Sequence, residues 1–95
     1  MPPSPPSVDL RLTVPAAAPY HAVAGELAGK FAEYFGADAG AAAQLAKAVE
    51  ALVDALGATA PNGSIALVME AREREMVVVA ESGGRREEAT CPLPA

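Results

Sequence analysis

Hydrophobic and polar positions divide the first part of the chain into a strand followed by a helix. Apolar residues alternate with polar ones over 8–14, which predicts a strand with one buried face that stops at Pro15. Over 20–35 the larger apolar residues recur every three or four positions, which predicts a helix with one buried stripe. The stripe consists of Tyr20, Val23, Leu27, Phe31 and Phe35. Gly36 suits the position just after a helix, so we expect the helix to end there.

A second helix is predicted between Asp38, a good N-cap residue, and Gly57, which is expected to close it. Its apolar positions again have helical spacing, which places one stripe in the core. This stripe consists of Leu45, Val49, Leu52, Val53 and Leu56. Small residues would let the two helices approach closely, and these are Ala24, Ala28, Ala41 and Ala48.

The second half of the chain is predicted to form strands. Residues 64–72 alternate, residues 76–81 are nearly all apolar as in a central strand, and a charged turn at 73–75 joins them into a hairpin. A further edge strand at 87–91 is left open. Two consecutive helices and an antiparallel hairpin bury their apolar faces most simply as two layers. We therefore predict an α+β fold in which two helices pack on one face of a small, mainly antiparallel sheet, in the order β-α-α-β-β.

Length and composition indicate one domain. The chain has 95 residues, 52% of them hydrophobic, and we assign 8–95 to a single domain behind a disordered proline and serine leader at 1–7. Much of the hydrophobic share is alanine, so the small core would gain from self-association. The net charge of −5 argues against nucleic acid as a partner. Neither a signal peptide nor a membrane-spanning apolar run is visible, so we expect a cytoplasmic protein.

Few side chains in the sequence offer chemistry on their own. His21 has no persuasive catalytic partner, and we expect a half-exposed structural residue. Cys91 is the only cysteine, and we expect it to fill space in the core. One histidine and one cysteine far apart make no metal-binding pattern, so no metal is expected.

The order of elements resembles that of the anti-sigma-factor serine kinases of the histidine-kinase-like (GHKL) ATPase superfamily. Three segments carry the resemblance, which spans residues 8–84. They are VDLRLTVPAAAPYHAVAGELAGKFAEYFGAD, similar to the family's first strand and helix, QLAKAVEALVDALG, similar to its N-box helix, and SIALVMEAREREMVVVAESGG, similar to the following hairpin.

The resemblance also implies a nucleotide site, whose motifs are altered here. The N-box E-x-x-x-N falls on Glu50 and Asp54, where the family uses the Glu to orient the attacking group and the Asn to bind Mg²⁺. An aspartate can also ligate Mg²⁺. The D-x-G-x-G box falls on Glu81 and Gly83, with a longer acid in the first position and Arg85 in place of the second glycine. The family's glycine-rich lid does not occur after these residues, and phosphoryl transfer needs the water exclusion that a lid provides.

These observations predict a noncatalytic protein-interaction and dimerisation module in bacterial regulation, with a protein partner, a homodimeric state and no cofactor. Glu50 and Asp54 are then a solvated helix flank, on which Lys47 can pair with Glu50. A small Mg-nucleotide-dependent enzyme that uses Glu50, Asp54 and Glu81 is the first alternative. The second alternative is a structural scaffold that assembles through a strand edge.

Overall fold

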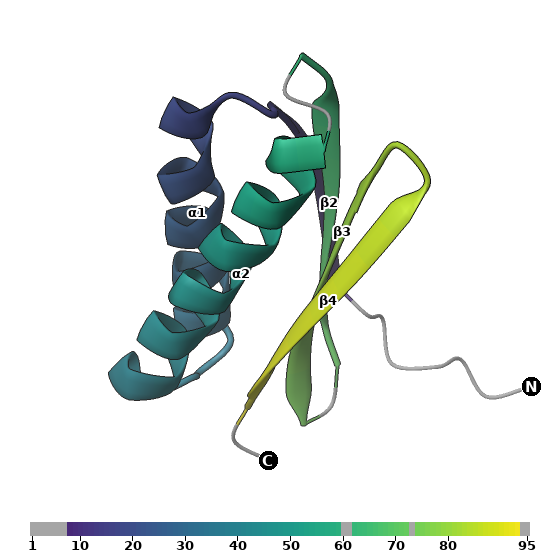
Figure 1. The fold of residues 1–95 in the computed structure, drawn as a ribbon. Coiled ribbons are helices and arrows are strands. Elements are labelled where there is room, and N and C mark those ends of the chain that lie inside the picture. Colours follow the sequence, from purple (N-terminus) through teal and green to yellow (C-terminus); the bar gives the residue numbers. More distant parts are fainter. Residues whose placement is uncertain (1–7, 60–61, 73, 94–95) are drawn as a thin grey trace, which may run out of the picture.

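A four-stranded sheet carries two helices on one of its faces (Figure 1). This computed structural model describes residues 8–59, 62–72 and 74–93, so the predicted leader at 1–7 lies outside the described residues. The elements are β1 (Val8–Pro15), η1 (Ala18–Tyr20), α1 (His21–Tyr34), α2 (Ala39–Thr59), β2 (Ser64–Ala71), β3 (Glu75–Ser82) and β4 (Arg85–Pro92). The α+β prediction is confirmed, and the strand left open at 87–91 forms as β4.

The sheet has the order β1-β2-β3-β4, and every neighbouring pair is antiparallel. A row of partners such as Leu10↔Met69, Met69↔Val78 and Val78↔Ala89 runs across all four strands, so these residues share one face. The β3–β4 turn is formed by Gly83 and Gly84, whose φ angles of 55° and 83° favour glycine. The helices cover the face that this row presents, and the other face stays uncovered (Figure 1).

The core lies between α2 and the covered face of the sheet. The predicted α2 stripe is confirmed, because Leu45, Val49, Val53 and Leu56 are at most 1% exposed and Leu52 packs partly buried against them. The sheet contributes Ile65, Leu67, Met69, Met76 and Val78, all almost fully buried. Cys91 is also buried, as predicted.

The buried face of α1 differs from the prediction. Tyr20, Val23 and Leu27 were expected in the core, yet they are 39% to 45% exposed, whereas Phe31 and Phe35 are partly buried. The side of α1 that is buried carries only His21 and small residues, namely Ala24, Gly25, Ala28, Gly29 and Ala32. The reason is steric, since at Gly25 and Gly29 the backbone of α1 lies so close to α2 that large side chains do not fit between the helices there.

The close approach of the helices depends on glycine in α1. A Cβ on Gly25 would lie 2.5 Å from the carbonyl oxygen of Ala46, and one on Gly29 would lie 3.2 Å from that of Ala42. The contact on α2 is therefore made by Ala42 and Ala46. Of the alanines predicted there, Ala48 is exposed.

Of the three helix-terminal residues predicted from the sequence, two are confirmed. Gly36 has a φ of 96° after α1, and Asp38 caps α2 by accepting a 2.8 Å hydrogen bond from the Ala41 backbone N–H. Gly57 does not close α2, which continues to Thr59. Gly57 is buried within the helix. A Cβ there would lie 2.8 Å from the Ala16 carbonyl oxygen, so this close contact favours glycine at the position. Neither described helix is long and apolar enough to cross a membrane.

Candidate functional site

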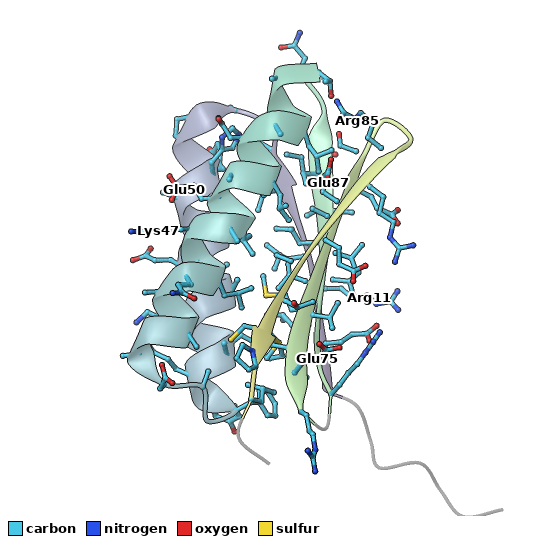
Figure 2. The ribbon with its side chains drawn as sticks, turned by 60° about the horizontal axis from the view of Figure 1, so that its bottom comes forward. Arg11, Lys47, Glu50, Glu75, Arg85 and Glu87 are labelled. Atoms are coloured by element: carbon cyan, nitrogen blue, oxygen red, sulfur yellow. The ribbon has the colours of Figure 1, made fainter. Side chains whose placement is uncertain are left out.

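The two N-box positions lie together on an exposed part of α2. Glu50 and Asp54 line a shallow depression with His21, Lys47 and Ala51. Figure 2 shows Lys47 and Glu50 projecting from α2 on the side away from the sheet. Within the described chain Lys47 makes no ion pair with Glu50, so both charges face solvent. The depression is open, and it resembles a helix flank more than an enclosed site.

His21 is the one buried polar residue at this depression, and it connects three segments. Its Nε2 donates to the Ala16 carbonyl oxygen at 2.8 Å, and its Nδ1 lies 3.2 Å from Asp54 Oδ1. A carbonyl and a carboxylate can only accept, so the ring satisfies both contacts when each nitrogen carries a proton. His21 thus ties the β1–α1 connection to α2.

The sequence prediction for His21 is wrong in two respects. The residue is 7% exposed, where a half-exposed position was expected, and it has a carboxylate partner, Asp54, which sequence reasoning missed. The pair is separated by 33 positions and is formed only by the packing of α1 on α2. Helical spacing within one segment could not reveal a contact between two helices. The small residues that share a face of α1 with His21 were visible in the sequence, and they were the available signal that this face is buried.

The second motif lies on the opposite side of the molecule. Ala80 and Ser82 face the helices and are buried, so Glu81 between them points from the uncovered face of the sheet. There its Oε1 is 3.8 Å from Arg86 Nε. Gly83 lies in the exposed β3–β4 turn. The structure therefore brings Glu50 and Asp54 together and leaves Glu81 and Gly83 apart from them, with the sheet in between.

Charges around the β3–β4 turn are largely paired with each other. Arg85 lies 3.8 Å from Glu87, and Arg86 lies between Glu81 and Glu88. Figure 2 shows Arg85 near the tip of this turn and Arg11 on the side of the sheet that faces away from the helices. Pairing of this kind offers no concentrated charge to a phosphate group.

No metal or nucleophile centre emerges among the described residues. They contain no group of three or more histidine, cysteine, aspartate or glutamate side chains that could hold a metal ion. Burial, and to a smaller extent the charge of Asp38, raises the pKa of the Cys91 thiol, which keeps this side chain neutral and unreactive.

The most unusual surface is an apolar face on α1. Four of its side chains are large and exposed, and Tyr34 is the most exposed of them at 83%. We call it the α1 face and define it by Val23, Leu27, Phe31 and Tyr34 of α1 together with Tyr20, the residue directly before the helix. Exposed aromatic and aliphatic side chains that gather on one helix face commonly mark a binding surface.

Helix α1 lies toward the β1 side of the sheet (Figure 1). α2 packs mainly on β4 and β3. α1 lies on the side of α2 that is farther from β4 (Figure 1). Leu10 and Leu12 of β1 are only partly buried beneath the helix layer and extend the apolar character of this end.

No protein-family model matches the chain, and no curated protein matches it. The similarity to the anti-sigma kinases therefore remains a prediction from the quoted segments.

Proposed function

We propose that this chain is a noncatalytic protein-interaction module that self-associates and contacts a protein partner, with a regulatory role in the cytoplasm of a bacterial cell. The regulatory and bacterial parts of the proposal depend on the resemblance to the anti-sigma kinases. The interaction part depends on the α1 face, which is the single observation that carries it.

The exposure of the α1 face favours binding over a purely structural role for these side chains. Val23 and Leu27 on α1 and Tyr20 directly before it are large, mainly apolar side chains that are 39% to 45% exposed. A monomer that left them in water would forgo the free energy of burying them. Tyrosine is also enriched at protein interfaces, because its ring is apolar and its hydroxyl tolerates water.

The arrangement of the altered motifs argues against catalysis. A nucleotide site would need Glu50, Asp54 and Glu81 to converge on one ligand. Glu81 instead lies on the uncovered face of the sheet beside Arg86, and Asp54 lies beside His21. These positions do not supply a common ligand site.

Two measurements test the proposal against the nucleotide alternative. We expect no saturable heat in calorimetric titrations with Mg·ATP or Mg·ADP, and no NMR shift changes centred on residues 50–54 and 81–84. We also expect affinity capture from the native cell to recover a defined protein. Saturable nucleotide binding at those residues would contradict the noncatalytic proposal, and repeated capture of no protein would contradict the partner-binding part.

A further inference from the structure

The α1 face has a symmetric spacing along the helix. Leu27 is its central residue, with Val23 and Phe31 four positions away on either side, and Tyr20 and Tyr34 seven positions away. These spacings are those of a helical seam. A pattern that is the same in both directions can pair with an antiparallel copy of itself, and such pairing is what a two-fold symmetric dimer requires.

We infer that the α1 face binds a second copy of this chain, with the two α1 helices antiparallel about a two-fold axis at Leu27. In this register Leu27 meets Leu27 of the partner subunit, and Val23 meets Phe31 of the partner subunit. Tyr20 meets Tyr34 of the partner subunit at each end. The inference rests on the proposed function, because it names the partner of the α1 face.

The charges beside the seam fit the same register. Glu26 and Lys30 are exposed and lie on one flank of the α1 face. In the antiparallel dimer, Glu26 lies about 3 Å along the axis from Lys30 of the partner subunit, at 1.5 Å rise per residue. Two opposite-charge pairs form by symmetry, which favours this register and this orientation.

The two ends of the sheet explain why a second copy approaches at α1. The edge strand β4 begins with four charged residues, Arg85, Arg86, Glu87 and Glu88, which protect that edge from association. Helix α1 lies on the side of α2 that is farther from β4 (Figure 1), and Leu10 and Leu12 of β1 are partly buried apolar residues. The apolar surface is therefore on the side of the molecule away from this charged edge.

The exposed area of the α1 face matches a small, reversible interface. An aromatic side chain has about 150–250 Å², so Tyr20 and Tyr34, at 45% and 83% exposed, contribute on the order of 200–300 Å². Val23 and Leu27 add to this area. A standard interface buries about 800 Å² per partner, so the α1 face with its charged flank lies at the small end of interface sizes, where weak and reversible association is the rule.

Sedimentation equilibrium over about 1 μM to 1 mM tests the dimer. Leu27→Glu places two like charges on the symmetry axis and should weaken association by about 100-fold or more. Ala22→Glu, an exposed position on the same helix outside the α1 face, should leave association unchanged. Circular dichroism checks that both variants remain folded. A wild-type monomer at 1 mM, or equal effects of the two variants, would overturn the inference.

Cysteine cross-linking tests the register separately, in a Cys91→Ala background. Leu27→Cys should form a disulfide with its own copy under mild oxidation. Val23→Cys and Phe31→Cys should each link poorly alone and at least about 10-fold better when mixed, because disulfides require Cβ atoms within about 4.5 Å. Preferential self-linking of Val23→Cys would exclude the antiparallel register. Failure of these experiments removes the homodimer and with it the self-association part of the proposed function, whereas capture of another protein tests the partner-binding part independently.

Discussion

The glycine contact between α1 and α2 leads to a prediction with a magnitude. Substituting Gly25 by alanine adds a Cβ that would lie 2.5 Å from the Ala46 carbonyl oxygen, whereas ordinary contact begins at 3.4 Å. The helices must therefore separate locally by about 0.9 Å, because the atom in the way is backbone and cannot rotate aside.

That separation weakens the neighbouring contacts between the helices. A gap of about 0.5–1 Å forfeits a quarter to a half of the dispersion energy of each affected contact. Overpacking of a close-packed interior costs about 1–3 kcal/mol, and replacing glycine by alanine within a helix returns about 1 kcal/mol. We expect Gly25→Ala to lower the free energy of unfolding by up to about 2 kcal/mol, which corresponds to at most roughly 15 °C in Tm for a domain of this size.

Urea unfolding followed by circular dichroism, at one fixed protein concentration, measures this change. Gly40→Ala is the matched control, because Gly40 is exposed in the first turn of α2 and a Cβ there meets only Asp38 Oδ1, at 3.3 Å. It should be neutral or stabilising by up to about 1 kcal/mol. If Gly25→Ala were as stable as Gly40→Ala, the explanation of why α1 buries its small residues would be refuted.

Three further predictions concern single side chains. Asp38→Ala removes the α2 cap and should lower the free energy of unfolding, measured in urea, by about 1 kcal/mol. A change below about 0.3 kcal/mol would argue against the cap. His21→Ala leaves the buried Ala16 carbonyl without its donor and should lower the free energy of unfolding by about 1–3 kcal/mol. Asp54→Ala removes an exposed carboxylate and should lower it by less than about 1 kcal/mol. A larger loss for Asp54→Ala than for His21→Ala would contradict the role of His21. The pKa of the Cys91 thiol is raised in the folded state, so its contribution to stability is complete below the ordinary thiol pKa of about 8.5 and decreases as the pH rises above it. Urea midpoints between pH 7 and pH 10 should fall more steeply for the wild type than for Cys91→Ala, and parallel curves would contradict this.

The sheet and α2 could be predicted from the sequence because their patterns have one interpretation. Residues 76–80 are apolar in succession and occupy the interior strand β3, and the α2 stripe is the only set of large apolar residues on that helix. Asp38 and Gly36 act through local backbone geometry, which depends on few neighbours. In these regions local pattern and tertiary packing agree.

α1 could not be predicted correctly because it carries two stripes with helical spacing. One contains Tyr20, Val23 and Leu27, and the other contains Ala24, Gly25 and Ala28. Hydrophobicity favours burying the first, whereas the structure buries the second, because backbone contact with α2 is available only to residues without large side chains. The same ambiguity hid the contact between His21 and Asp54.

One feature of α1 accounts for both the candidate site and the apolar surface. Gly25 and Gly29 fix the rotation of α1 about its axis by their contacts with α2. With that rotation fixed, His21 Nδ1 lies 3.2 Å from Oδ1 of the exposed Asp54. The larger side chains are then directed outward, away from α2. The rotation that brings His21 to Asp54 therefore also exposes Leu27, so the contact between His21 and Asp54 and the presence of the α1 face have a common geometric cause.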